Sequence, residues 1–235
     1  MELGTVLGVW AHPDDEAYLS SGIMAQAVRD GSRVVCVTAT RGEGGSMDEE
    51  RWPSATLGAV REGELLASLA HLGVAEHYFL DLPDIDMDTP LPEPEGAQRV
   101  LELVEEVQPQ TILTFGPEGM TGHEAHKSVC RWATDAFHAT APPGARLYYA
   151  THSQEWADEW VTRLNEFEIF RPGTPVVVAR ADLDLVYDAP PDILELKGRA
   201  LGEHVSQLEG LFTVFGKDRL VEAMATESFR LAATR

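Results

Sequence analysis

One short stretch, Ala11-His12-Pro13-Asp14-Asp15-Glu16, carries residue types that bind metals. It places one imidazole and three carboxylates in a turn, and zinc favours imidazole and carboxylate ligands. Three neighbouring carboxylates repel one another unless a cation or a proton lies among them. Pro13 stiffens the turn and lacks an N–H, so it can hold His12 and Asp15 in a fixed relation. The structural alternative is that Asp14 or Asp15 caps the following helix. We take a metal site as the leading hypothesis.

A second candidate is the pair His123 and His126, which follows an apolar strand and the glycine-rich segment 116–122. Histidines three residues apart share one helix face and can reach one point. Such a pair is common by itself, so its spacing alone predicts little. Its position after a strand gives it more weight, because open α/β sheets bind ligands at the carboxyl ends of their strands.

These two groups need a sheet that brings strand ends together, and the chain alternates strand and helix patterns as such a sheet requires. We expect the first helix over 17–29 and the histidine-bearing helix over 124–139. Further helices are expected over 57–72, 97–107 and 192 to about 208, and a loop followed by a helix over 211–235. Expected strands cover 5–10, 33–39, 78–80, 111–115, 147–150 and 175–179.

We therefore predict an α/β fold: a Rossmann-like, mostly parallel twisted sheet with helices on both faces, plus a small C-terminal annex. The alternation becomes less clear after residue 150, where aromatic residues indicate a packed annex. We expect one domain over 1–235, with a core over 1–150 and an annex over 151–235 that completes the site.

Composition narrows the range of partners. The net charge of −21 argues against nucleic acid, whose phosphates require a surplus of Lys and Arg. No apolar run is long enough to span a membrane, and no signal peptide is evident, so we expect a cytoplasmic protein. Cys36 and Cys130 lie far apart in apolar contexts, which is typical of buried free thiols. A homo-oligomer is compatible with the sequence.

A glycine-rich loop, Thr40–Gly45, follows the second expected strand. It lacks the phosphate-binding pattern of a P-loop, and the first strand lacks the dinucleotide fingerprint, so nucleotide binding is weakly supported. We expect a substrate loop, with residues 46–51 as a lid. In the next helix, Arg61 and Glu64 lie three residues apart, and their plainest interpretation is an exposed ion pair.

The motifs together resemble the LmbE-like or PIG-L-type deacetylases, metal-dependent enzymes that remove N-acetyl groups from N-acetylglucosamine conjugates. The stretch from Ala11 to Glu16 and the Gly122-His123-x-x-His126 motif are the specific parts. Four supporting motifs fit in order, so the resemblance spans nearly the whole chain. They are Thr40-Arg41-Gly42-Glu43, Arg61-x-x-Glu64 before Leu72-Gly73-Val74, Asp81-Leu82-Pro83-Asp84, and a late helix with Lys197, Ala200, His204, Ser206 and Gln207.

The resemblance implies a role for each matching residue. His12, Asp15 and His126 would bind zinc, or Fe²⁺ or another divalent metal. Asp14 would be the base that takes a proton from the metal-bound water. His123 would face the oxyanion or protonate the leaving amine. Arg41 and Arg61 would lie near the sugar conjugate. Three protein ligands leave a fourth zinc position open, as a catalytic site requires.

The chain departs from the family at one position. The family commonly has Asp immediately before its last metal ligand, where this chain has Ala125, preceded by Glu124. An Asp there would orient or charge the neighbouring histidine, so the acid strength of His123 is in question. We expect either another carboxylate, Asp84 or Glu227, to replace it, or a weaker enzyme.

We therefore predict a zinc-dependent hydrolase that removes the N-acetyl group from a small N-acetylglucosamine conjugate. One alternative is an amidase that cleaves a related amide in a sugar-thiol conjugate, which would use the same residues. Another is a non-catalytic metal- or sugar-binding protein, which would not need Asp14. The sequence does not define the aglycone, the native metal or the oligomeric state.

Overall fold

The computed structural model describes residues 2–235. In this part of the chain, an eight-stranded sheet forms the centre, with the order β3-β2-β1-β4-β5-β8-β7, and β6 paired to β5 outside this path. Strands β1 to β5 run parallel, and β8 is antiparallel to both β5 and β7. The predicted mostly parallel α/β sheet is therefore confirmed.

Buried apolar strands form the middle of the sheet. β1 (Val6–Trp10), β2 (Val34–Thr40) and β4 (Thr111–Phe115) are buried at every residue. Such continuous apolar runs are typical of parallel strands covered on both faces. The remaining strands are β3 (Glu76–Leu82), β5 (Arg146–Ser153), β6 (Val177–Val178), β7 (Leu185–Asp188) and β8 (Thr226–Thr234).

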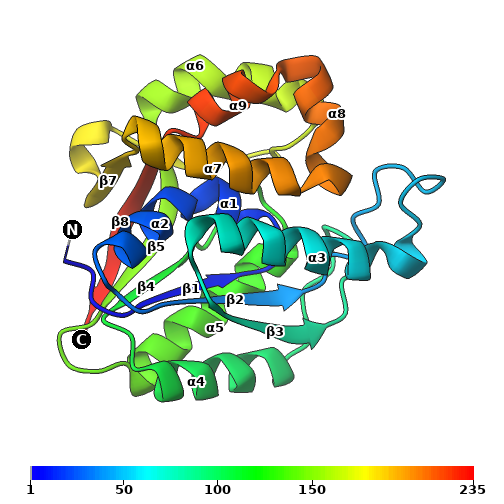
Figure 1. Cartoon of the computed structure of the whole chain (residues 1–235). Coiled ribbons are helices and arrows are strands. Elements are labelled where there is room, and N and C mark those ends of the chain that lie inside the picture. The colour runs from blue at the N-terminus through cyan, green and yellow to red at the C-terminus, as the bar shows by residue number, and fades with distance from the viewer. Residues whose placement is uncertain (1) are drawn as a thin grey trace.

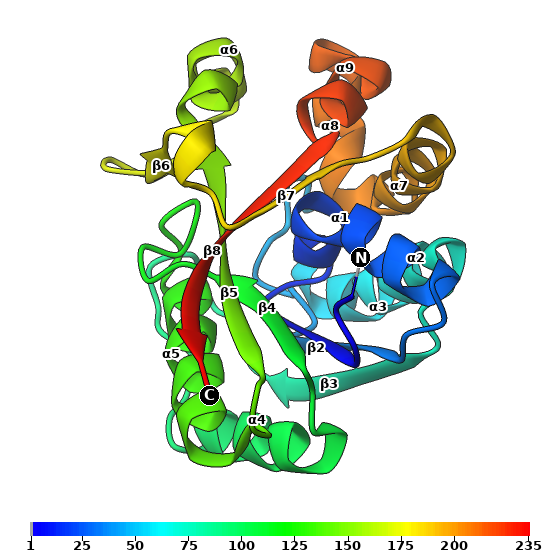
Figure 2. The ribbon, with the colours of Figure 1, turned by 90° about the vertical axis from the view of Figure 1, so that its left-hand side faces the viewer.

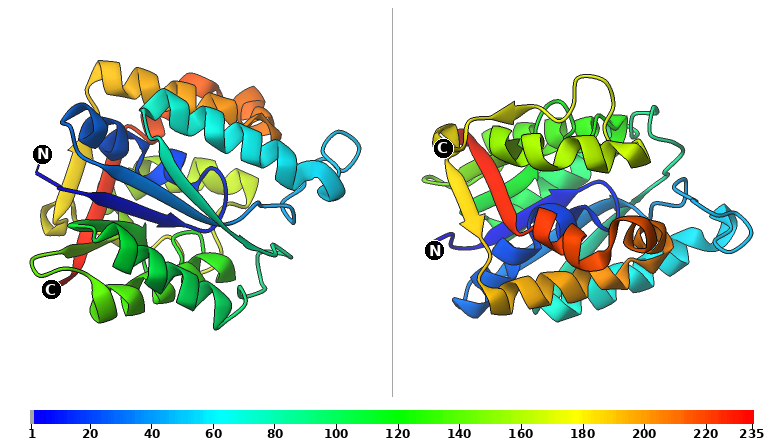
Figure 3. Two further views of the ribbon diagram at one scale, coloured as in Figure 1. Left: turned by 60° about the horizontal axis from the view of Figure 1, so that its bottom comes forward. Right: turned by 90° about the horizontal axis from the view of Figure 1, so that it is seen from above.

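Helices cover both faces of the sheet (Figures 1 and 3). On one face lie α4 (Glu95–Val107) and α5 (Glu124–Thr140), packed against each other. The other face is covered by α1 (Asp15–Leu19), α2 (Ser21–Arg29), α3 (Ser54–Leu72) and α7 (Pro191–Glu203). Beyond this layer lie α6 (Gln154–Leu164), α8 (Val205–Phe215) and α9 (Lys217–Ala223) (Figure 2). Two 3₁₀ turns, η1 (Asn165–Phe167) and η2 (Arg180–Asp182), lie in the same part of the chain.

Two helices predicted as continuous are broken. The first breaks at Ser20, because the carboxylate of Glu227 accepts hydrogen bonds from the N–H groups of Gly22 (2.7 Å) and Ile23 (2.8 Å). This carboxylate supplies an N-terminal cap for α2 from 205 residues away. The second breaks at His204, between α7 and α8.

The expected loop followed by a helix over 211–235 is only partly confirmed, because this region contains the helix α9 but ends in a strand. Helix α8 continues to Phe215, α9 follows, and the chain then returns to the sheet as β8 between β5 and β7. Inside this region the buried ammonium of Lys197 contacts a Glu227 carboxylate oxygen at 2.5 Å and donates to the carbonyl of Tyr18 at 2.9 Å. Residues 151–235 therefore complete the main sheet as well as adding helices to it.

The strand order fixes the place of a site. From β1 the chain proceeds through β2 to β3 on one side, while β4 and β5 lie on the other side. The direction of the sheet connections thus reverses between β1 and β4, and ligands bind at the carboxyl ends of strands at such a reversal.

Candidate active site

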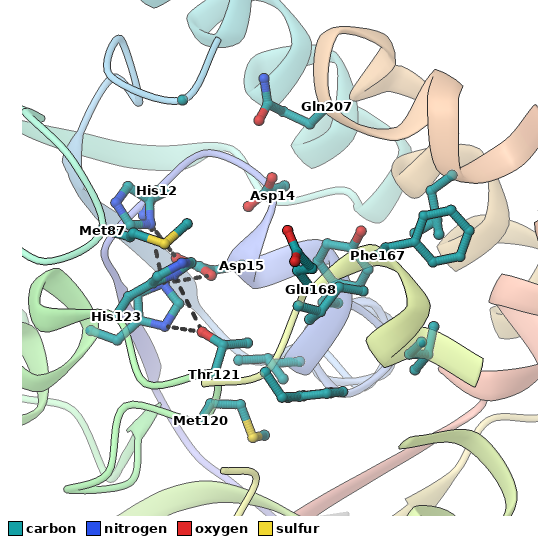
Figure 4. A pocket seen from close by; sticks show the side chains of 18 of the residues that line it. His12, Asp14, Asp15, Met87, Met120, Thr121, His123, Phe167, Glu168 and Gln207 are labelled. Carbon is teal, nitrogen blue, oxygen red and sulfur yellow. Dashed lines mark hydrogen bonds and ion pairs between the residues drawn. The ribbon is translucent and has the colours of Figure 1, made fainter. Parts of the chain in front are cut away.

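The turn after β1 is held by one of its own carboxylates. The Asp15 Oδ2 atom accepts the N–H groups of His12 (2.8 Å) and Ala11 (3.2 Å). This fixes the turn so that His12 and Asp14 face the same cavity (Figure 4). The sequence explanation of a turn stiffened by Pro13 is thus incomplete, because Asp15 also closes the turn through its side chain.

The helix after β4 brings the second group to the same place. His126 is buried at the start of α5, stacks on Phe115 with ring centroids 4.0 Å apart, and donates from Nδ1 to the Gly119 carbonyl at 2.9 Å. Its Nε2 atom then has a free lone pair, and this atom lies 3.1 Å from His12 Nδ1. His123 Nδ1 lies 3.4 Å from the same Nε2 atom.

Three imidazoles therefore converge. His12, His123 and His126 each offer a nitrogen within 4.8 Å of the others, as a shared metal ion requires. Asp15 joins this group, with Oδ1 3.4 Å from His126 Nε2 and Oδ2 3.7 Å from His12 Nδ1. Donor atoms about 2.0–2.1 Å from a tetrahedral metal lie about 3.4 Å from one another. The observed separations of 3.1–3.7 Å fit that spacing.

Outer partners orient the imidazoles. Asp84 Oδ1 lies 3.4 Å from His12 Nε2, which leaves His12 Nδ1 to face the cluster. A carboxylate or carbonyl behind each histidine is the usual arrangement around a bound metal. Asp84 therefore serves His12 and is not the partner expected for His123. Glu227 is not that partner either, since it binds Lys197 and the start of α2.

His123 has no carboxylate partner among residues 2–235. Its neighbours are Thr121 Oγ1, 3.3 Å from Nδ1, and the His12 and His126 rings. Burial, reinforced by the two neighbouring imidazoles, lowers the pKa of His123 to about 3. Ala125 occupies the position where the family commonly has an Asp. It is 1% exposed and packs in the hydrophobic core. His123 is thus neutral at pH 7 in the metal-free protein.

Asp14 lines the same cavity as the three histidines. Its Oδ2 atom accepts a hydrogen bond from Arg61 Nη2 at 3.1 Å, and its own N–H donates to Glu16 Oε2 at 3.1 Å. Burial raises the pKa of Asp14 to about 6 even though the Arg61 charge opposes the shift. Burial likewise raises the pKa of Asp15 to about 6, against the lowering effect of His12. A bound cation would favour the ionised form of both carboxylates.

Arg61 is not the exposed ion-pair residue that its helix spacing suggested. It is only 3% exposed, and it donates to the Pro13 carbonyl at 2.6 Å and the Gly42 carbonyl at 3.0 Å as well as to Asp14. Its predicted helix partner, Glu64, instead accepts the N–H and the hydroxyl of Ser206, both at 2.7 Å. Arg61 thus lines the cavity and clamps the turn that carries Asp14.

Arg41 is not brought to this cavity. Its guanidinium contacts Glu62 and Asp81 and lies over the ring of Phe79, with the carbon 4.2 Å from the centroid. The part of the glycine-rich loop that does line the cavity is Gly44 and Gly45, followed by Met47. The structure therefore gives no support to a substrate contact by Arg41.

Sequence reasoning missed two buried residues that support Asp14. Glu16 accepts the Asp14 N–H, and its other oxygen lies 3.2 Å from His204 Nε2 and 3.4 Å from Ser68 Oγ. Both Glu16 and His204 are fully buried. Glu16 ends the stretch that begins at Ala11, and His204 belongs to the motif of the late helix. Neither motif indicates that the two side chains meet.

With this geometry established, the family can be assigned. The sequence profile described as PIG-L, GlcNAc-PI de-N-acetylase, matches residues 7–137, more than half of the chain. The chain belongs to the PIG-L family. The matched region contains the turn after β1 and the start of α5, so it includes all the proposed metal ligands.

Proteins similar in sequence to this PIG-L protein are known from several species. One from Kineococcus radiotolerans is 33% identical over 86% of this chain and 68% of its own length. One from Streptomyces avermitilis is 29% identical over 87% of this chain and 83% of its own. Both are named 1D-myo-inositol 2-acetamido-2-deoxy-alpha-D-glucopyranoside deacetylase.

Solved structures share the fold of this PIG-L protein. The N,N'-diacetylchitobiose deacetylase from Pyrococcus horikoshii matches with a TM-score of 0.69 at 19% identity, covering 98% of this chain and 84% of that one. GalB, the 4-carboxy-2-hydroxymuconate hydratase from Pseudomonas putida KT2440, matches with a TM-score of 0.68 at 16% identity, covering 99% and 98%. Because one neighbour is a hydratase, the fold alone does not decide the reaction.

None of the helices within residues 2–235 is both long enough and apolar enough to cross a membrane. This finding agrees with the absence of a long apolar run in the sequence.

Proposed function

We propose that this PIG-L protein is a zinc-dependent N-deacetylase that removes the N-acetyl group from a small N-acetylglucosamine conjugate. The observation that carries the proposal is the convergence of His12, Asp15 and His126 at the ends of β1 and β4, with Asp14 in the same cavity. The family and the names of the curated relatives support the reaction type.

The donor set suits a divalent metal. His12, Asp15 and His126 would hold it, since two imidazoles and one carboxylate are a known catalytic zinc set that leaves an open position. Fe²⁺ accepts the same ligand types. When bound, the metal supplies a Lewis acid for the amide carbonyl and acidifies water. Burial lowers the pKa of His126, so this imidazole need not lose a proton when a metal binds. For His12, Asp84 and Asp15 outweigh burial and raise the pKa, so metal binding there competes with a proton.

The side chains around the proposed metal ligands have separate roles in the reaction. Asp14 accepts the proton of the attacking water, since a bound cation would keep this buried carboxylate ionised and thus able to act as a general base. His123 faces the amide oxygen as a neutral hydrogen-bond donor, and the proton that Asp14 takes from water passes on to the leaving amine. Arg61 keeps the Asp14 carboxylate oriented, because it binds the Pro13 carbonyl at the same time.

A free-amine assay tests the proposal. The zinc-loaded protein is incubated with a panel of N-acetylglucosaminides, and the released amine is measured before and after chelation. Release of amine that chelation abolishes and zinc restores is the expected result. If no amine were released from any member while metal remained bound, the proposal would fail in favour of a binding protein.

A further inference from the structure

The cavity that holds the proposed metal site has a second half of different chemistry. The cavity encloses about 350 Å³. Its lining residues come from many parts of the chain and include Tyr18, Leu19 and Met224. Figure 4 shows Phe167 and Glu168 across the cavity from His12 and His123. Side chains after residue 150 make this second half largely apolar. We call it the apolar lobe, and it is formed chiefly by Trp156, Leu164, Phe167, Phe170, Leu211 and Met224.

The cavity is poorly suited to an anionic ligand. Among the described residues that line it, Arg61 is the one lysine or arginine, and its guanidinium already binds Asp14 and two backbone carbonyls. The other charged lining residues include Asp84, Asp86 and Glu168, which repel phosphate or carboxylate groups. The cavity therefore disfavours ligands that carry phosphate or carboxylate groups.

His152 adds one neutral polar group to the lobe. It lies at the end of β5, is 8% exposed, and stacks on Trp156 with ring centroids 3.5 Å apart. Its side chain makes no hydrogen bond or ion pair with any other residue in the range 2–235, and it lines the cavity. Burial lowers its pKa to about 3, so the ring is neutral and can bind a hydroxyl or a carbonyl.

We infer that the apolar lobe is a substrate subsite that takes an alkyl or aryl substituent of an uncharged N-acylglucosamine derivative. The inference rests on the proposed deacetylase function and adds the class of substrate. The polar half, with Asp14, Arg61 and Asp84, faces the amino sugar, and the apolar lobe covers the substituent. A polyhydroxylated or phosphorylated substituent would leave its polar groups without partners there.

Chain-length series test this inference and locate the substituent. One series compares methyl with octyl glycosides of N-acetylglucosamine, and the other compares N-acetyl with N-octanoyl amides of methyl glucosaminide. Each methylene buried in the lobe raises kcat/KM by about fourfold until the lobe is full. A gain in the first series assigns the lobe to the aglycone, and a gain in the second assigns it to the acyl chain. Equal kcat/KM throughout would overturn the inference and leave the deacetylase function standing.

Binding of the hydrolysis products, the amines and the carboxylic acids, separates the two proposals, because these compounds contain no amide. By calorimetry, the octyl glucosaminide is expected to bind the zinc-loaded protein more tightly than the methyl glucosaminide if the lobe holds the aglycone. For an acyl lobe, octanoate is expected to bind more tightly than acetate. Tighter binding without any amide hydrolysis would support the lobe and refute the proposed function.

A variant pair checks the location. Phe167→Ser removes a half-buried ring from the lobe, whereas Phe215→Ser removes a half-buried ring from the same apolar cluster without lining the cavity. Phe167→Ser is expected to lower the ratio of octyl to methyl kcat/KM by about tenfold or more. Phe215→Ser is expected to keep the advantage. The reverse pattern would place the apolar substituent elsewhere.

Discussion

Asp14 holds an unusual backbone conformation, with φ 121° and ψ −29°. Such a conformation in a residue other than glycine costs about 1–3 kcal/mol and persists only where neighbours impose it. Here Glu16 accepts the Asp14 N–H, while Arg61 binds both the Pro13 carbonyl and the Asp14 carboxylate. The turn thus stores strain at the residue to which we assign the proton transfer.

Replacing the carboxylate tests that assignment. Asp14→Asn keeps the size and the contact with Arg61 but removes the base. We expect kcat to fall by roughly 10²–10⁴-fold, the usual contribution of a general base, with metal content unchanged. Activity and elemental analysis on the same sample provide the check. Full activity in a metal-loaded variant would remove Asp14 from the mechanism.

His123 has two possible roles in this geometry, and one variant distinguishes them. Its Nδ1 atom lies 3.4 Å from His126 Nε2, close enough to share a metal, but we assign it to the amide oxygen. His123→Ala is then expected to lower kcat by about 10²–10³-fold at unchanged metal affinity, as for the loss of an oxyanion partner. A large loss of metal affinity instead would identify His123 as a ligand.

At the scale of elements, the turn after β1 depends on contacts from other segments. Helix α3 supplies Arg61 and Ser68, and His204 reaches the turn from the junction of α7 and α8. The loop after β2 supplies the Gly42 carbonyl, which accepts a hydrogen bond from Arg61. Changes in these elements should therefore alter catalysis without touching the proposed ligands.

Gly42 offers such a change. Its φ is +68°, and an added Cβ would lie 2.3 Å from Arg61 Nη1, so Gly42→Ala forces the guanidinium away from Asp14. We expect a fall in kcat of roughly tenfold or more with metal retained. Gly31→Ala is the matched control, because Gly31 also has a positive φ, +85°, but no atom within 4 Å of the added Cβ. Equal activity in the two variants would show that the clamp does not matter.

The buried contact of His204 with Glu16 predicts a pH dependence of stability. Burial alone would lower the pKa of His204, but the hydrogen bond and charge of Glu16 outweigh it, so the net pKa is raised. Protonated His204 therefore stabilises the fold below its unfolded pKa of about 6.5, and this contribution is lost as pH rises through the folded pKa. Urea unfolding of wild type and His204→Asn should differ most near pH 6 and progressively less toward pH 9.

The control for this experiment is His71→Asn. His71 contacts Glu203 at 2.8 Å, but both side chains are about one-third exposed, so the pair contributes little. A stability difference for His204→Asn that stays constant from pH 6 to 9 would contradict the assigned shift.

At the scale of the whole molecule, sequence patterns predicted those elements whose conformation depends on residues close together in the chain. The buried runs of β1, β2 and β4 were found from their apolar residues. The end of α3 at Gly73 also follows locally, because this residue adopts a left-handed conformation, φ 75°. The meeting of the two histidine groups was predictable because both follow strands whose ends share one edge of the sheet.

The errors have one physical origin, which is contact between distant parts of the chain. The break between α1 and α2 depends on Glu227, and the burial of Arg61 depends on carbonyls of Pro13 and Gly42. Neither partner can be read from helical periodicity. The strand β8 was missed for the same reason, since its pairing with β5 and β7 determines its conformation.

The most direct test of the account is a zinc titration of the metal-stripped protein, with release of amine from an N-acetylglucosaminide as the readout. Wild type is expected to gain activity linearly and to reach its plateau at one equivalent of zinc. His126→Ala should require a large excess, because it lacks one of the three assigned ligands. Amide hydrolysis by wild type that does not depend on added metal, or saturation of His126→Ala at the same single equivalent, would contradict the central claim.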